Sequence, residues 1–451
     1  MTSLWFRSAL LSDGWAADVR LVIDNGCIDR IARGVEPTSG DERHAIAVPG
    51  LPNLHSHAFQ RGMAGLAEMR GPASDSFWTW RDVMYRFVDR MEPADLQAVA
   101  AQAYVEMLEA GFTRVGEFHY LHHAGDGARY ADIGELAARI ASAAGETGIA
   151  LTLLPVFYAH GGFGGRPPGT GQRRFITDPA HFAELMDASR RAIAPLAGAV
   201  LGIAPHSLRA ATTSEIAAIL PLAEGGPVHI HVAEQTKEVD DCLAWCGRRP
   251  VDLLLDHAEV DTRWCLVHAT HMSETELARL AASGAVVGLC PITEANLGDG
   301  VFPAQAFLAA GGRIGVGSDS NVLIDAAEEL RLLEYSQRLT LRARNVLALG
   351  EGRTSGRSLF DAALAGGAQA LGASAGLAEG LPADLLSLDA RHPCLVARTG
   401  DAVLDGWFFA AATSPVDCVW RHGVRLVSGG RHHRREAVAD RFRTVLEHLL
   451  T

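Results

Sequence analysis

Two histidines spaced two residues apart, His55 and His57, are the first residues whose types and spacing could do chemistry. They follow an apolar segment, residues 45–50, that ends in a Pro-Gly pair and is typical of a buried strand. Side chains two residues apart in an extended segment point to the same side. Two imidazoles at the end of a strand are half of a metal site. The alternative is a pair of polar loop histidines, and the rest of the chain must decide between them.

Further residues able to bind a metal or transfer a proton follow later apolar segments. They are His206, His231, Glu234, His268 and Asp319. Each lies at or just after the expected carboxyl end of a strand. Any one of them alone is more often structural than functional. Together they predict a metal-dependent enzyme, because the carboxyl ends of barrel strands hold the chemistry.

Four residues would supply three nitrogens and one carboxylate oxygen to a catalytic zinc ion: His55, His57, His231 and Asp319. We expect one ion per chain, with a position left open for a water whose pKa the metal lowers toward neutrality. Glu234 suits proton shuttling, and His268 and Asp319 suit holding or accepting the proton of that water. Iron or manganese are alternatives to zinc.

The elements that must position these residues form a repeating pattern between residues 48 and 380. Short apolar segments alternate with helical segments, as in βα units with parallel strands. The candidate strands are residues 45–54, 113–118, 149–156, 200–205, 227–232, 264–268, 285–290 and 313–317. Eight such units predict an α/β fold with a TIM-like (β/α)₈ barrel. A doubly wound open sheet is the alternative, although the Gly-rich fingerprints of its nucleotide-binding forms are absent.

The two ends of the chain have a different pattern from the middle. Residues 1–47 and 381–451 contain short β segments, and a helix is expected near the carboxyl end. We predict that both ends combine into one small β-sandwich domain flanking the barrel of residues 48–380. Two insertions at strand ends, residues 67–90 and 160–178, are candidates for lids over the site. Functionless surface loops are the alternative.

Composition excludes several classes of function. The chain has 451 residues, 48% of them hydrophobic, so a large core is available. A formal net charge of −13 argues against general nucleic-acid binding. No apolar stretch is long enough for a membrane span. Seven scattered cysteines favour a reducing compartment. The first residues do not have the pattern of a signal peptide, so we expect the cytoplasm.

The arrangement of ligands resembles the amidohydrolase superfamily: His-x-His after strand one, His after strands five and six, and Asp after strand eight. Binuclear members of that superfamily use a carbamylated lysine after strand four. The only lysine of this chain, Lys237, follows strand five, which favours a single metal. The HVAE segment, residues 231–234, resembles the mononuclear deaminase branch.

Longer strings are similar to the formimidoylglutamate deiminase family within that branch. They are LPNLHSHAFQRGMAGL, GEFHYLHH, APHSLRA, HIHVAEQTKEV, LVHATHMS and GLCPITEANLGDGVF. The resemblance implies hydrolysis of N-formimidoyl-L-glutamate to N-formyl-L-glutamate and ammonia, a step of histidine degradation. It also implies a homodimer. An aminohydrolase acting on a purine, pyrimidine or triazine is the alternative, and a catalytically silent binding protein is a more distant one.

A substrate with two carboxylates requires arginine side chains, whose fork matches carboxylate geometry. Arg81 and Arg209 are the candidates, and the resemblance adds Gln60, Tyr120 and His206 as substrate contacts. Other arginines could serve instead: Arg61, Arg173 and Arg174. A histidine cluster could indicate a second metal, although a polar loop is the preferred interpretation: His119, His122 and His123.

Overall fold

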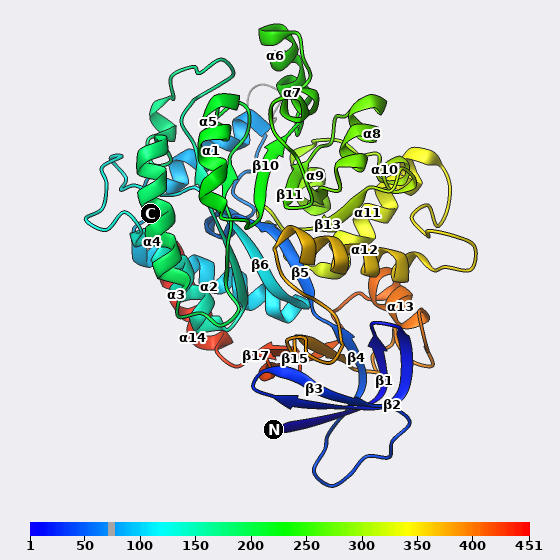
Figure 1. Cartoon of the computed structure of the whole chain (residues 1–451). Coiled ribbons are helices and arrows are strands. Elements are labelled where there is room, and N and C mark those ends of the chain that lie inside the picture. Colours follow the sequence, from blue (N-terminus) through cyan, green and yellow to red (C-terminus); the bar gives the residue numbers. More distant parts are fainter. Residues whose placement is uncertain (71–76) are drawn as a thin grey trace.

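Two kinds of β-sheet divide the chain, one built from its ends and one from its middle (Figure 1). The computed structural model describes residues 1–70 and 77–451, and the side chains of 77 and 78 are also outside the description. The first insertion, residues 67–90, therefore falls partly outside the described residues.

The terminal sheet has eight strands in the order β17-β16-β15-β14-β4-β1-β2-β3. Its strands are β1 (Thr2–Leu11), β2 (Gly14–Asp24), β3 (Cys27–Ala32), β4 (Glu42–Pro49), β14 (Leu385–Leu388), β15 (Val416–Arg421), β16 (Val424–Ser428) and β17 (Arg431–His432). Strand β14 pairs antiparallel with β4, so the two ends of the chain meet in the middle of the sheet. In Figure 1 the blue amino-terminal strands accordingly lie beside the orange and red carboxyl-terminal ones. This pairing of both ends follows the sequence prediction.

The middle of the chain forms two parallel sheets. One contains β5 (Leu51–Ser56), β6 (Phe112–His119), β7 (Ala150–Phe157) and β8 (Val200–Leu201), with β9 (Ala204–Pro205) paired to β7. The other contains β10 (Val228–Val232), β11 (Trp264–His268), β12 (Val286–Leu289) and β13 (Arg313–Val316). Most of these strands are buried along their whole length, which explains their continuous apolar sequences. Isolated parallel bridges link the two sheets, Ser56 with Asp319 on one side and Ile203 with Val228 on the other.

The first predicted parallel strand, residues 45–54, is wrong as a single element. The structure divides it into β4 of the terminal sheet and β5 of the parallel sheet, separated by Gly50. A Cβ atom at Gly50 would lie 2.2 Å from the Thr113 side chain, so only glycine lets the chain pass at this point. The predicted strand 200–205 is likewise two short segments, β8 and β9.

Helices separate the parallel strands and continue into the carboxyl-terminal part. They are α1 (Phe77–Val88), α2 (Pro93–Ala110), α3 (Glu135–Thr147), α4 (Pro179–Ile193), α5 (Thr213–Ile219), α6 (Thr236–Cys246), α7 (Pro250–His257), α8 (Glu274–Ser283), α9 (Pro291–Leu297), α10 (Ala304–Ala309), α11 (Ala326–Leu341), α12 (Ser355–Ala370), α13 (Ala402–Ala410) and α14 (Arg435–Leu450). Short 3₁₀ turns are η1 (Ala58–Met63), η2 (Thr170–Gln172) and η3 (Leu220–Ala223). None of the helices in the described part of the chain combines the length and apolar character that a membrane span requires.

Local sequence explains where individual helices begin and end. Helix α8 starts with a capping box, in which Ser273 accepts from the backbone of Glu276 and Glu276 accepts from the backbone of Ser273. Helices α2 and α8 end at Gly111 and Gly284, both in the left-handed conformation that glycine adopts readily. A helix start such as that of α8 ends the loop that follows the preceding strand.

Candidate active site

Four ligand atoms converge where β5, β10 and the segment after β13 meet. His55 Nε2 lies 3.2 Å from His57 Nε2 and 3.0 Å from His231 Nε2. Asp319 Oδ1 lies 3.2 Å from His57 Nε2 and 3.4 Å from His55 Nε2. Ligand atoms about 2.1 Å from one zinc ion are separated by about 3.0–3.4 Å. The spacing therefore fits a metal ion bound by all four side chains.

The partners of the other ring nitrogens strengthen this fit. His57 Nδ1–H donates to the carbonyl oxygen of Phe118 at 3.0 Å, and His231 Nδ1–H donates to that of His206 at 3.2 Å. A carbonyl can only accept, so the proton of each neutral ring is on Nδ1. The Nε2 lone pairs consequently face one another in a buried space, an arrangement that a cation between them stabilises.

Burial keeps the histidines in the form that binds metal. It lowers the pKa of His57 to about 3, with a further decrease from the neighbouring His55. It also lowers the pKa of His55 and of His231. For Asp319 burial acts in the opposite direction, but His55 and His57 outweigh it and hold the pKa of that carboxyl below its usual range. Neutral imidazoles and an ionised carboxylate are what metal coordination requires.

The backbone around the cluster is strained. Ala233, His268, Ala269, Asp319 and Asn321 all have positive φ angles, between 45° and 68°. Such conformations persist only where the surrounding structure fixes them.

A buried side-chain network supplies that constraint behind Asp319. The Asn321 amide donates to the carbonyl oxygens of His57 and Asp319 at 3.0 and 3.1 Å. The backbone N–H of Asp319 donates to the carbonyl oxygen of His55, and that of His57 donates to the carbonyl oxygen of Asp319, each at 2.9 Å. The first and last parallel strands are thus joined at the ligands themselves.

Glu234 and His268 lie beside the ligand cluster. His268 Nε2 is 3.9 Å from Glu234 Oε1 and 3.7 Å from Asp319 Oδ2. Burial raises the pKa of Glu234, and the nearby His268 and Arg209 oppose that rise. For His268 burial lowers the pKa, but Glu234, Glu294 and Asp319 together raise it to about 10. Two groups with pKa values displaced in this way are suited to moving protons.

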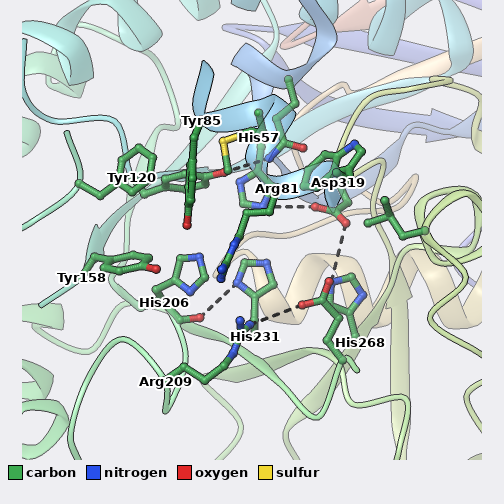
Figure 2. Close-up of a pocket in the computed structure, with 16 residues that line it drawn as sticks. His57, Arg81, Tyr85, Tyr120, Tyr158, His206, Arg209, His231, His268 and Asp319 are labelled. Atoms are coloured by element: carbon green, nitrogen blue, oxygen red, sulfur yellow. Dashed lines mark hydrogen bonds and ion pairs between the residues drawn. The ribbon is translucent and has the colours of Figure 1, made fainter. Parts of the chain in front are cut away.

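Another part of the wall of the same pocket carries the two arginines (Figure 2). Arg209 Nη2 is 3.7 Å from Glu234 Oε2, and Arg209 Nε is 3.8 Å from Glu238 Oε2. Arg81 comes from α1 and lies with its guanidinium carbon 5.5 Å from the centre of the Tyr85 ring. Both predicted carboxylate-binding arginines therefore face one pocket.

The three other predicted substrate contacts also line this pocket. Gln60 donates to the hydroxyl of Tyr120 at 2.9 Å. The Tyr120 ring packs edge-on against His206, with 5.7 Å between ring centres. The structure thus brings together every site residue that the sequence singled out, in one pocket and its buried floor.

The alternative arginines have partners outside the pocket. Arg61 forms an ion pair with Glu106 at 2.6 Å, and Arg173 pairs with Asp89 at 2.9 Å. Arg174 is fully buried and donates to the backbone carbonyl of His123 at 2.8 Å. None of the three is among the described residues that line the pocket.

Two histidines of the cluster at the end of β6 have structural partners as well. His122 Nε2–H donates to the carbonyl oxygen of Val156 at 2.9 Å, and His123 Nε2–H donates to that of Ile176 at 2.8 Å. These bonds favour the polar-loop interpretation.

Lys237 lies on α6 and pairs with Asp241 at 2.7 Å, with more than half of its side chain exposed. Lys237 is thus exposed, whereas a metal-bridging lysine would have to be buried in the site.

Sequence reasoning missed several residues that line the pocket, among them Tyr85, Tyr158 and Phe175. Tyr158 directly follows β7, so the same strand-end rule that found the histidines would have found it. Phe175 is buried and belongs to the loop of residues 160–178, so part of that loop is a fixed wall of the pocket. Whether the rest of the loop closes over a substrate stays a prediction.

Comparison with known proteins identifies the class. The chain belongs to the amidohydrolase family, whose model matches residues 46–426. A model for the amino-terminal domain of formimidoylglutamate deiminase HutF matches residues 1–45. The chain is 52% identical to the formimidoylglutamate deiminase of Pseudomonas aeruginosa, over the full length of both. Together these matches identify an enzyme of the formimidoylglutamate deiminase type, a hydrolase acting on carbon–nitrogen bonds.

Solved structures agree with this placement. An amidohydrolase from Brucella melitensis is 56% identical and superposes with a TM-score of 0.97, covering all of both chains. An adenosine deaminase from Xanthomonas campestris, solved with bound zinc, is 22% identical, with a TM-score of 0.80 over 100% of this chain and 98% of its own. The second likeness concerns the fold alone.

Proposed function

We propose that this chain hydrolyses N-formimidoyl-L-glutamate to N-formyl-L-glutamate and ammonia, as a step of histidine degradation. One observation carries the proposal: a single pocket joins a His/His/His/Asp cluster to two arginines. A linear amidine with two carboxylates matches that combination. The full-length likeness to a formimidoylglutamate deiminase points to the same substrate.

We propose that His55, His57, His231 and Asp319 hold one metal ion, with zinc as the expected element. When bound, such an ion would polarise a water and lower its pKa, which supplies a nucleophile near neutral pH. The chain itself orients two of the imidazoles, His57 and His231, through the carbonyl partners of their Nδ1 atoms, and burial keeps all three neutral.

Proton transfer is assigned to the side chains beside the ligands. The carboxylate of Asp319 would accept the proton lost by the attacking water. His268 would hold that water through Nε2, since its neighbouring carboxylates raise its pKa to about 10 and keep the ring protonated near neutral pH. Glu234 would deliver a proton to the nitrogen that leaves as ammonia. Its raised pKa keeps a protonated fraction available near neutral pH.

Recognition of the substrate is assigned to the other wall. Arg81 and Arg209 would bind the two carboxylates through charge-assisted hydrogen bonds. Gln60, Tyr120 and His206 would contact the substrate between the carboxylates and the reacting carbon. These side chains orient the amidine toward the ligand cluster.

The architecture that we propose is a closed (β/α)₈ barrel over residues 48–380. The backbone bridges that link both sides of the two parallel sheets support closure. Residues 1–47 and 381–451 would form the flanking β-sandwich. Curling of the terminal sheet supports that part, since Phe6 of β1 and Trp420 of β15 pack with their rings 6.3 Å apart although two strands separate them.

A homodimer in the cytoplasm completes the proposal, and sedimentation analysis would test the dimer.

The decisive experiment measures ammonia release by purified protein of known metal content. We expect rapid release from N-formimidoyl-L-glutamate, N-formyl-L-glutamate as the second product, and about one metal ion per chain. Adenosine and an aminotriazine serve as comparison substrates for the alternative aminohydrolase. Preference for either one over the amidine would overturn the proposal.

A further inference from the structure

Glu294 is a buried carboxylate behind the pocket that no step described above uses. It lies on α9 and is 6% exposed. Its Oε1 atom accepts from His268 Nδ1–H at 3.2 Å and from the backbone N–H of Cys290 at 2.9 Å. It is absent from the described residues that line the pocket. Its carboxylate therefore reaches the site only through His268.

The contact with Glu294 fixes the direction of the His268 ring. With Nδ1–H donating to Glu294, the opposite nitrogen, Nε2, faces Glu234 and Asp319 at 3.9 and 3.7 Å. His268 and Ala269 both have positive φ angles, so the backbone here is strained. A side-chain anchor on the ring keeps Nε2 aimed into the pocket in spite of that strain.

We propose that Glu294 is a positioning residue, which holds the Nδ1–H of the His268 ring toward its own carboxylate and so presents Nε2 to the reacting atoms. The role given to His268 in this inference rests on the proposed function. The orientation of the ring does not, because it follows from the hydrogen bond alone.

A purely structural role for Glu294 has a matched control in Glu329 of α11, which contacts the same helix, α9. Glu329 is fully buried, and its Oε2 atom accepts from the backbone N–H of Ile292 at 3.0 Å. Two carboxylates thus anchor the start of α9, but only Glu294 also contacts His268. A variant of Glu329 removes an anchor of α9 and leaves the ring contact in place.

The kinetic test compares Glu294→Ala, Glu294→Gln and Glu329→Ala on N-formimidoyl-L-glutamate. We expect Glu294→Ala to lower kcat about 100-fold with KM within about threefold and metal content unchanged. Glu294→Gln keeps an oxygen that can accept from Nδ1–H, so it should stay within about fivefold of the natural enzyme. In a His268→Asn background, Glu294→Ala should cost no more than about twofold, because the two residues act as a unit. Glu329→Ala should leave kcat within about threefold.

Three kinetic outcomes would overturn the inference. The first is a rise in KM at constant kcat for Glu294→Ala. The second is an equal loss of kcat in Glu329→Ala, which would make anchoring of α9 the cause. The third is the full loss recurring in the His268→Asn background.

A spectroscopic measurement separates failure of this inference from failure of the proposed function. In protein labelled with ¹⁵N at histidine, the His268 Nδ1 proton should give a slowly exchanging downfield signal without any substrate. It should disappear in Glu294→Ala and in His268→Asn and persist in Glu329→Ala. A signal unaffected by Glu294→Ala would refute the positioning role even in an active enzyme. Its loss in a protein inactive on the amidine would instead retain that role and reject the substrate.

Discussion

The two walls of the pocket are built in different ways. The ligand wall comes from the ends of parallel strands and the short segments after them, and its side chains are held by backbone carbonyls and by the Asn321 network. The arginine wall comes from loops and helices: Arg81 from α1 and Arg209 from the loop before α5. Arg209 lies 3.7 and 3.8 Å from its two carboxylate partners, Glu234 and Glu238.

This difference matches a division between chemistry and recognition. A reaction centre needs its groups fixed within a fraction of an ångström, which strand ends provide. Specificity can reside on loops, which vary without disturbing the sheet. Changes in the ligand wall should therefore abolish turnover, whereas changes in the arginine wall should alter substrate preference.

The largest effect is expected for Glu234→Gln. The amide keeps the shape of the side chain but cannot deliver a proton, so kcat should fall about 1,000-fold or more. Metal content and thermal unfolding serve as controls and should stay unchanged, because Glu234 is not a proposed ligand. Turnover within tenfold of the natural enzyme would remove Glu234 from the chemical step.

Arg209→Met should have a smaller effect and a different kind of effect. Loss of one charge-assisted fork should lower kcat/KM by about 2 kcal/mol, or about thirtyfold, through a higher KM. The matched control is Arg173→Met, since Arg173 pairs with Asp89 outside the pocket and should leave kcat/KM near that of the natural enzyme. Equal losses in the two variants would contradict the assignment of Arg209.

Retention of the metal in mild acid should show how rigid the ligand wall is. Protonation of a histidine removes a ligand, so metal leaves as the pH falls through the pKa values of the folded site. Because burial lowers the pKa of His57 to about 3, the ion should remain bound at pH 5, well below the ordinary histidine pKa of about 6.5. Metal analysis after dialysis at a series of pH values tests this. Release with a midpoint near the ordinary value would show that the ligands are more exposed than the structure indicates.

The smallest expected effect concerns the loop of residues 160–178. If its exposed, Gly-rich part closes over the pocket, a non-hydrolysable substrate analogue should slow proteolytic cleavage within it a fewfold. Cleavage in the exposed loop between β3 and β4 is the internal control and should not respond. An unchanged rate in both loops would leave residues 160–178 as a fixed wall only.

The ligand wall could be predicted from sequence because its rules are local. His-x-His after an apolar segment and single polar residues at later strand ends are visible without coordinates. The break at Gly50 was not visible, because it depends on the close approach of Thr113, a residue distant in sequence.

The arginine wall was only partly predictable. Carboxylate recognition points to arginines, and nothing local separates Arg81 and Arg209 from Arg61, Arg173 and Arg174. Their partners separate them, and those partners come from other elements, as with Asp89 for Arg173. Glu294 was missed for a similar reason, since its contact with His268 spans 26 residues and two elements.

The most direct test of this division combines one enzyme variant with two shortened substrates, as in a double-mutant cycle. Kinetics of the natural enzyme and of Arg209→Met would be measured on N-formimidoyl-L-glutamate and on two analogues, each lacking one carboxylate. The account predicts that one analogue loses about thirtyfold in kcat/KM with the natural enzyme and almost nothing further in Arg209→Met. If kcat/KM of the two enzymes differed by the same factor on all three substrates, Arg209 would bind neither carboxylate. The separation of chemistry from recognition would then fail.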